Sequence, residues 1–147
     1  MRDRFLSQIA TLGPIGTLPA PGTMGSLAAV LLGMVITINL GVGALVVFII
    51  IAALIGIPAA TAHYRITGIK DAGSVIIDEV VGQWLVLLVI PVMPSLTPAY
   101  MTMLALAFVL FRFFDIIKMG PVKSAETLPG AFGVMADDVV AGILAGL

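Results

Sequence analysis

Charge is absent from most of this chain. No Asp, Glu, Lys or Arg occurs in residues 5–64, 80–111 or 139–147. Soluble proteins spread charge over their surface helices, whereas long uncharged stretches are typical of segments that lipid surrounds. The polar stretches are therefore the candidate active site, because little else in the chain can do chemistry. The seven basic and eight acidic residues all lie in residues 2–4, 65–79 and 112–138.

Cysteine is also absent, and the net charge is −1. The lack of cysteine excludes a thiol nucleophile, an iron–sulfur cluster, a thiolate zinc site and a disulfide. The small net charge leaves no basic footprint for nucleic acid. Hydrophobic residues make up 61% of the sequence and the mean hydropathy is +1.22, against about 45–50% apolar residues in an average soluble domain. A very hydrophobic soluble helical protein is the alternative, but a chain of this length cannot bury that many apolar side chains.

Four apolar segments predict helices that cross the bilayer, and the first two approach the ~20 residues that a ~30 Å hydrocarbon core requires. A last helix from Met135 is too short to span, so it re-enters the membrane, packs against other helices or is cut short. We expect an all-α, polytopic membrane helical bundle of about four to five apolar helices, forming one domain over residues 1–147. The four segments are residues 24–40, 42–62, 80–92 and 99–117.

The first 21 residues are predicted to form a segment at the membrane interface. Residues 1–12 predict a short amphipathic helix with Phe5, Leu6 and Ile9 on one side. Glycines and prolines predict a loop over residues 13–25. They also interrupt any continuous apolar core, so this segment does not read as a signal peptide.

The positions of the charges predict the topology. If the four apolar segments cross the bilayer, every Lys and Arg falls on one side, and the opposite turns at residues 41–43 and 94–98 carry no charge. The positive-inside rule places the charged side in the cytoplasm. We therefore expect acidic residues that are far apart in the sequence to converge on one cytoplasmic face.

Two acidic pairs and one further aspartate form the first candidate site. Asp78-Glu79 begins the third apolar helix, Asp115 ends the fourth, and Asp137-Asp138 begins the last. Carboxylates without matching bases stay ionised together when a cation lies between them, and oxygen ligands favour Mg²⁺ or Mn²⁺. The alternative is that each acid caps a helix and complements its dipole. Because the chain has only eight acids, two pairs plus Asp115 favour a metal site.

Arg112, Asp115 and Lys118 recur every three residues, so they share one face near the cytoplasmic end of a helix. Arginine binds phosphate through two parallel hydrogen bonds, and lysine acts as a point charge. The pattern indicates a phosphate-binding face. The alternative is a set of basic side chains that extend to the interface, with one ion pair inside the helix.

The segment Pro21–Ser26 precedes the first apolar helix and is rich in glycine. Free backbone N–H groups at a helix start, with the hydroxyls of Thr23 and Ser26, indicate a phosphate-binding turn. The alternative is an ordinary N-cap by Thr23 or Ser26.

Three aromatic or titratable residues receive no catalytic role. His63, the single histidine, lies at the end of the second apolar segment and is read as a structural interfacial residue. Trp84 and Tyr64 are expected in the aromatic belt of the membrane interface.

Four motifs occur in order over residues 22–142. They are Gly22-Thr23-Met24-Gly25-Ser26, Ile77-Asp78-Glu79-Val80-Val81-Gly82-Gln83, Phe111-Arg112-Phe113-Phe114-Asp115-Ile116-Ile117-Lys118 and Gly133-Val134-Met135-Ala136-Asp137-Asp138-Val139-Val140-Ala141-Gly142. Together they resemble the motifs of the phosphatidylglycerophosphatase A family. The family usually has Lys-Pro-x-Pro after its Phe-Asp motif, whereas this chain has Lys118-Met119-Gly120-Pro121 and lacks the first proline. The departure bears on the rigidity of that loop rather than on the chemistry.

The resemblance implies an Mg²⁺-dependent enzyme of the bacterial inner membrane, with its active site on the cytoplasmic side. Such an enzyme removes the terminal phosphate of phosphatidylglycerophosphate and leaves phosphatidylglycerol. Asp138 or Glu79 is expected to orient or deprotonate the attacking water, and a phospho-enzyme on Thr23 is the variant. The implied metal ligands are Asp78, Glu79, Asp115, Asp137 and Asp138; the implied catalytic residues are Asp78, Glu79, Asp115 and Asp138; the implied substrate-binding residues are Gly22, Thr23, Ser26, Arg112 and Lys118.

Two other functions compete with this interpretation. A lipid phosphotransferase would use the same metal and phosphate groups but would need a second substrate and a longer acidic signature. A cation transporter would carry charges inside its apolar spans, facing a pore. The predicted spans are free of charge until their last turns, which disfavours a transporter.

Overall fold

The protein is described here by a computed structural model that covers residues 1–93 and 95–147. Over this part of the chain it is all-helical and has no strand, which confirms the predicted fold class. The helices are α1 (Arg2–Ala10), η1, a 3-10 helix (Gly13–Thr17), α2 (Pro21–Leu40), α3 (Val42–Thr67), α4 (Ile77–Leu87), α5 (Pro98–Ile117), α6 (Pro121–Glu126) and α7 (Ala131–Ala145).

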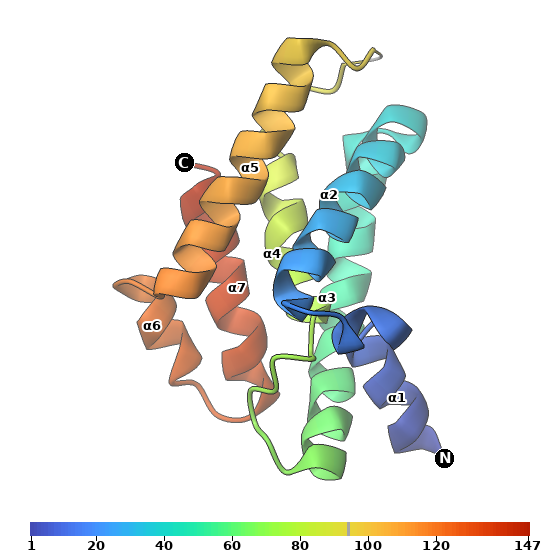
Figure 1. The fold of residues 1–147 in the computed structure, drawn as a ribbon, viewed down its shortest axis with the longest axis vertical. Coiled ribbons are helices and arrows are strands. Elements are labelled where there is room, and N and C mark those ends of the chain that lie inside the picture. The colour runs from blue at the N-terminus through green and yellow to red at the C-terminus, as the bar shows by residue number, and fades with distance from the viewer. Residues whose placement is uncertain (94) are drawn as a thin grey trace.

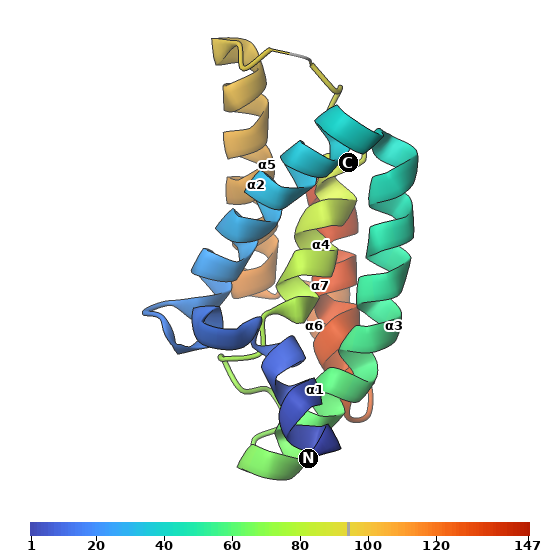
Figure 2. The same ribbon diagram turned by 90° about the vertical axis from the view of Figure 1, so that its right-hand side faces the viewer.

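Among the described residues, three helices are long and apolar enough to cross a membrane: α2, α3 and α5. The 20 residues of α2 and of α5 rise about 30 Å, which matches the hydrocarbon core of a bilayer. Helices α2 and α3 run in opposite directions and meet at Gly41, whose positive φ of 84° suits glycine. Figure 2 shows α4 and α7 between these long helices.

The third predicted crossing helix is shorter than expected. The structure places α4 at Ile77–Leu87, so its 11 residues rise only about 16 Å. The expectation of four crossing helices is therefore wrong on length for this segment, because the α-helix ends at Leu87 and only turns with tighter i→i−3 hydrogen bonds continue to Ile90. The predicted turn at residues 94–98 includes residue 94, which lies outside the described residues. The last helix, α7, begins at Ala131, earlier than predicted, and packs against other helices rather than standing alone.

Helices α4 and α7 approach each other closely because both present glycine at their contact. A Cβ atom on Gly142 would overlap the carbonyl oxygen of Gly82, and one on Gly82 would meet the ring of Phe111 and the carbonyl oxygen of Asp138. Small residues allow this backbone contact between membrane helices. The contact holds the acidic pair Asp137-Asp138, in the middle of α7, beside the acidic start of α4.

The N-terminal segment differs in part from the prediction. The expected short helix is present as α1, which packs on the end of α3. The expected loop over residues 13–25 is too long, since η1 occupies part of it and α2 already begins at Pro21. Proline is favoured in the first turn because its missing N–H is not needed there. The glycine-rich motif thus forms the first turns of a helix.

Trp84 is not part of an interfacial belt. Its side chain is buried in the bundle, where Nε1 donates a hydrogen bond of 2.9 Å to the carbonyl of Ala29. The ring also lies against the backbone of Gly33, where a Cβ atom would leave no room. Tyr64, by contrast, is exposed near the end of α3.

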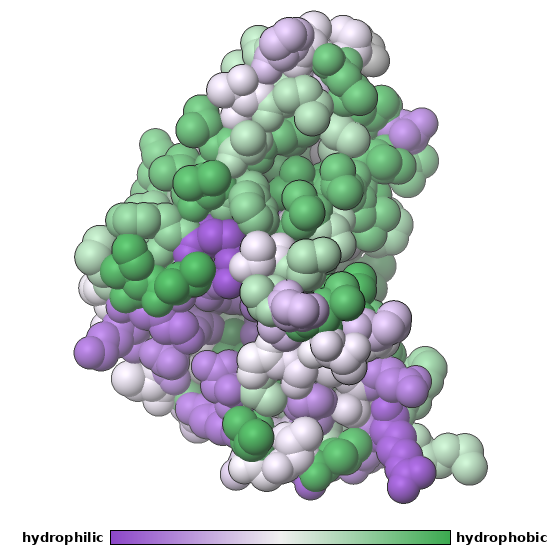
Figure 3. Space-filling model, in the orientation of Figure 1, coloured by the Kyte–Doolittle hydropathy of each residue, from purple (hydrophilic) through white to green (hydrophobic). Residues whose placement is uncertain are grey.

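Polarity divides the molecule along its long axis. In Figure 3 hydrophobic residues cover the upper part of this face and hydrophilic residues gather below. Figure 1 shows that the lower part contains the starts of α2, α4 and α7 and the end of α5. The fold therefore brings the charged segments to one end of the bundle, as the charge pattern predicts.

Candidate active site

The first two functional side chains come from the start of α4. Asp78 and Glu79 lie in its first turn, where the helix dipole favours negative charge. Oδ1 of Asp78 accepts a hydrogen bond of 3.0 Å from the backbone N–H of Glu79. Asp78 is buried and Glu79 nearly so. The N-cap of α4 is Ile76 and no side chain caps the helix, so the two acids complement the helix dipole without capping it, and they do so away from bulk water.

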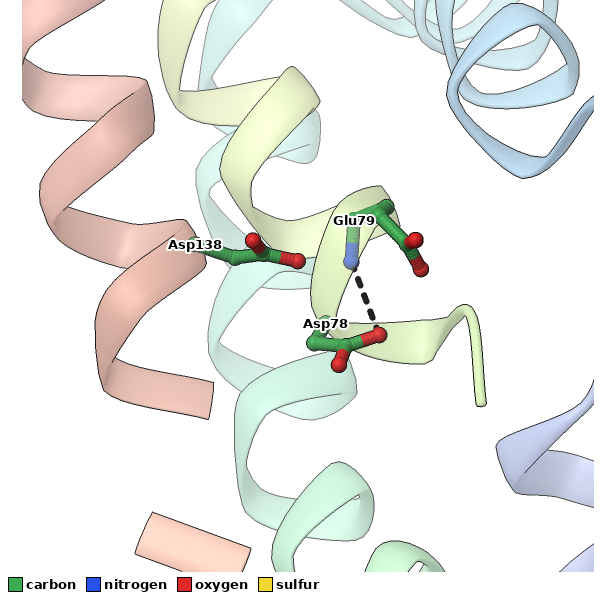
Figure 4. A group of neighbouring side chains, drawn as sticks. All are labelled: Asp78, Glu79 and Asp138. Atoms are coloured by element: carbon green, nitrogen blue, oxygen red, sulfur yellow. Dashed lines mark hydrogen bonds between the residues drawn. The ribbon is translucent and has the colours of Figure 1, made fainter. Parts of the chain in front are cut away.

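Asp138 of α7 completes a group of three carboxylates. One oxygen from each of Asp78, Glu79 and Asp138 lies within 4.8 Å of the others (Figure 4). Oε2 of Glu79 is buried and has no hydrogen-bond partner in the described part of the chain. We call these three residues the carboxylate trio. Oxygen donors gathered at this spacing, one of them unpartnered, suit a hard divalent cation.

The surroundings of the trio favour protonation when no cation is present. Burial raises the pKa of Asp78 to about 6. Burial, and next the charge of Asp78, raise the pKa of Glu79 and of Asp138 well above their ordinary values. The carboxylate of Asp115 raises both further. A cation at the trio would replace the protons that these residues otherwise hold.

Arg112 faces the trio from α5. Its Nη1 donates a hydrogen bond to Oδ2 of Asp115 one turn along the same helix, and it lies 3.7 Å from Oε1 of Glu79. Nε of Arg112 is buried and unpartnered among the described residues. Asp115 therefore orients the arginine. The guanidinium keeps N–H groups that can donate hydrogen bonds to a ligand oxygen.

The start of α2 lies against the same groups. A Cβ atom on Gly22 would overlap Oε1 of Glu79 and would lie 3.1 Å from Nη1 of Arg112. The first-turn N–H groups of a helix lack acceptors within it and attract anions. Ser26 does not face the site, since its buried Oγ donates a 2.8 Å hydrogen bond to the carbonyl of Gly22. The helix begins after Ala20, so neither Thr23 nor Ser26 is its N-cap.

The remaining predicted residues form a second cluster around Lys118. Its Nζ lies 2.6 Å from Asp137, 3.1 Å from Glu126 and 3.6 Å from Asp71. Burial lowers the pKa of Lys118, but its hydrogen bonds and the charges of its partners raise it overall. The structure thus separates Asp137 from the trio and pairs it with lysine. We call this group the lysine cluster.

Two residues of the lysine cluster and one residue beside the trio were given no site role from the sequence. Asp71 was expected only on the same face as the other acids, and Glu126 at the end of α6 was not singled out. The fold brings both to Lys118. Gln83 is fully buried in α4, one turn beyond Glu79, and both its amide atoms lack partners within the described ranges. A lone amide inside the apolar stretch 80–92 was the signal that could have identified Gln83.

A family model described as phosphatidylglycerophosphatase A matches residues 8–147. The chain belongs to the phosphatidylglycerophosphatase A family. A phosphatidylglycerophosphatase A of Haemophilus influenzae is 39% identical over an alignment of 151 positions. The alignment covers 95% of this chain and 89% of the relative. The Escherichia coli phosphatidylglycerophosphatase A is 33% identical, with 84% of this chain and 69% of the relative covered. No solved structure matches the chain.

A further relative carries a different substrate in its name. A Bacteroides thetaiotaomicron protein, named provisionally as a phosphatidylinositol-3-phosphatase, is 37% identical, covering 84% of this chain and 77% of the relative. Membership of the phosphatidylglycerophosphatase A family confirms the sequence resemblance and makes the chain a phosphatase, an enzyme that hydrolyses phosphoric monoesters. Its bacterial relatives and its apolar helices mark it as a bacterial membrane protein.

Proposed function

We propose that this phosphatase removes the terminal phosphate of phosphatidylglycerophosphate and releases phosphatidylglycerol, at the cytoplasmic face of the inner membrane. The observation that carries the proposal is the position of the carboxylate trio. It lies beside Arg112 and the start of α2, at the end of the bundle where apolar and polar surfaces meet. A lipid phosphate at the bilayer surface occupies that depth.

The trio is proposed to hold Mg²⁺. The fit rests on three carboxylate oxygens that lie within 4.8 Å of one another and on the unpartnered Oε2 of Glu79. Mg²⁺ bound there would polarise the phosphate and lower the pKa of a water molecule. Asp115 and Asp137, which the resemblance also offers as ligands, have basic partners in Arg112 and Lys118. We therefore assign them to positioning those bases.

The protein's own groups then share the work on the phosphate. Arg112 and the first N–H groups of α2 neutralise its oxygens, and Asp115 keeps the guanidinium in place. Glu79 or Asp138 accepts the proton of the attacking water, because their oxygens lie beside the position proposed for the metal. Gly22 keeps a side chain out of the space between α2 and these groups.

The first experiment is phosphate release by the purified protein in detergent. Phosphatidylglycerophosphate is supplied with Mg²⁺ and then with a chelator, and phosphatidylinositol 3-phosphate is assayed in parallel because of the Bacteroides relative. We expect phosphate release from phosphatidylglycerophosphate, and we expect this release to require Mg²⁺. Faster release from the inositol lipid would replace the proposed substrate, and release with no need for metal would remove Mg²⁺. Transfer of the phosphate to another lipid would favour a phosphotransferase.

The orientation has its own test, because the chain has no cysteine. Lys123→Cys on α6 and Ser95→Cys near the opposite end are both exposed single-cysteine variants. A membrane-impermeant maleimide added to spheroplasts should label Ser95→Cys, and should label Lys123→Cys only after the inner membrane is opened. The reverse pattern would contradict the cytoplasmic assignment.

A further inference from the structure

An apolar groove runs between α2 and α5. Its volume is about 220 Å³, and its lining is almost entirely apolar. Val30 and Leu104 are buried at its base, whereas its other lining residues are partly or largely exposed. In Figure 1 the two helices lie on either side of α4. The residues used below are Leu27, Val30 and Leu31 of α2 and Leu104, Ala105 and Phe108 of α5.

One end of this groove lies one helical turn from the candidate active site. Leu27 comes one helical turn after Thr23, and Phe108 comes one turn before Arg112. The space around Gly22 is shared with the Arg112 guanidinium. A molecule whose apolar part lies in the groove therefore has its polar end at the arginine and the start of α2.

The groove also has the reach of one lipid leaflet. The rise along α5 from Arg112 to Met101, which also lines the groove, is about 16 Å. Half of a ~30 Å hydrocarbon core is about 15 Å. The groove lining on α5 accounts for about 10 Å of this rise, from Phe108 to Met101, and the turn from Phe108 to Arg112 accounts for the rest.

A second apolar groove lies on another face of α2. It is lined by α2, α3, α4 and the N-terminal segment and is larger, at about 420 Å³. None of its lining residues belongs to α5, the helix that carries Arg112. The two grooves lie on different sides of α2, so the structure offers an internal control.

We propose that the α2–α5 groove binds one acyl chain of a phospholipid whose phosphate lies at Arg112 and the start of α2. The inference rests on the proposed function, because it places the lipid substrate of that same site.

The test fills each groove with the same substitution. Ala105→Phe blocks the α2–α5 groove, and Ala28→Phe is the matched control in the α2–α3–α4 groove. Hydrolysis of dipalmitoyl and dihexanoyl phosphatidylglycerophosphate is measured in the same mixed micelles. Ala105→Phe should lower kcat/KM for the long-chain lipid by about tenfold and leave the short-chain lipid unchanged. Normal short-chain hydrolysis also shows that the variant is folded.

The quantity compared is the ratio of long-chain to short-chain activity. The proposal is overturned if Ala105→Phe leaves this ratio unchanged, or if Ala28→Phe changes it by the same factor. Failure of the wild-type protein to hydrolyse either lipid would instead refute the proposed function.

In that case the groove is tested without catalysis, by photolabelling the protein with phosphatidic acid that carries a diazirine in its acyl chain. Labels should map to Leu27–Met34 and Met101–Phe108 and should disappear in Ala105→Phe. Labels around Leu12 and Trp84 would overturn it, and so would a wild-type protein that dimerises through this groove and becomes monomeric in Ala105→Phe.

Discussion

The carboxylate trio and the lysine cluster contain the same number of acids, but they differ in what surrounds the charge. In the lysine cluster two of the three acids are open to water, since the side chains of Asp71 and Glu126 are 50% and 42% exposed. The third, Asp137, is only 5% exposed and has the ammonium of Lys118 beside it. In the trio every acid is buried or nearly so, and the nearest base, Arg112, is already hydrogen-bonded to Asp115.

The comparison teaches how to distinguish a structural ion cluster from a binding site. Buried charge is costly unless it is paired. The lysine cluster meets this requirement with its own residues, so it can hold α6, α7 and the segment before α4 together without a ligand. The trio leaves Oε2 of Glu79 unpartnered in the described structure. It therefore requires protons or a cation from outside the chain.

The largest effect is expected from the trio itself. Asp138→Asn should lower kcat by about a thousandfold, because it removes an anionic oxygen from the group that handles the phosphate. The metal-free variant should melt no lower than the wild type, since a neutral amide replaces a carboxyl group whose charged form burial disfavours. Asp71→Asn, at the half-exposed edge of the lysine cluster, is the control and should stay within a few-fold of wild type. Similar losses in both variants would erase the distinction between the clusters.

A smaller loss is expected where the trio meets α2. Gly22→Ala places a methyl group on Glu79 and Arg112, so both must move. Misplacement of such groups should cost about a hundredfold in kcat/KM. Gly43→Ala is the matched control, because nothing lies within 4 Å of a Cβ atom there. Full activity of Gly22→Ala would show that the first turn of α2 does not serve the phosphate.

The lysine cluster gives the next test. Lys118→Met leaves Asp137 buried without its partner, which should destabilise the protein by roughly 1–3 kcal/mol and lower activity about tenfold through the displaced α7. Adding Asp137→Asn removes the unpaired charge and should restore the melting temperature and most of the activity. Restored melting with no return of activity would place Lys118 on the phosphate, as the sequence motif predicts.

Gln83 separates stability from activity. Gln83→Leu replaces a buried amide that lacks partners, and such a group costs roughly 1–3 kcal/mol in the folded state. The variant should therefore melt at a higher temperature and hydrolyse the lipid a few-fold more slowly. Thermal unfolding and steady-state kinetics on the same sample check both parts. A stabilised variant with unchanged kinetics would make Gln83 a packing residue only.

The smallest effect concerns pH. The pKa of Asp78 is raised from 3.8 to about 6, so the folded metal-free protein holds protons that the unfolded chain releases. Its stability should be highest below pH 4 and should fall as pH rises toward 6. Mg²⁺ must displace those protons, so its affinity should increase over the same range. Titration calorimetry at several pH values, with Asp78→Asn as the control, measures this dependence.

The sequence could predict the convergence of the charged segments because it depends only on the order of apolar runs. It could not predict the ends of those runs equally well. The apolar stretch 80–92 reads as one helix, yet α4 stops at Leu87, before Pro91. Proline and glycine at residues 21–25 read as a loop, although proline also begins helices well, and α2 starts there.

The sequence could predict which acidic residues form the candidate site. It could not predict which partner each of them contacts. Asp78 and Glu79 were predicted at the start of a helix, and α4 begins there. Asp138 was also predicted at a helix start, but α7 begins at Ala131, so Asp138 lies in the middle of that helix. The structure still brings the three together. The separation of Asp137 from Asp138 could not be read from the sequence, because adjacent residues on a helix point about 100° apart and the fold decides what each meets. The same holds for Glu126, which reaches Lys118 through the turn of α6.

The α2–α5 groove determines which substrate concentration should set the rate of this enzyme. The groove lies on helices long enough to cross the bilayer, and it faces sideways rather than toward water. A lipid that enters there arrives by diffusing within the plane of the membrane. Turnover should then follow the mole fraction of substrate among its neighbouring lipids, and diluting the whole suspension with buffer should leave the rate per enzyme unchanged.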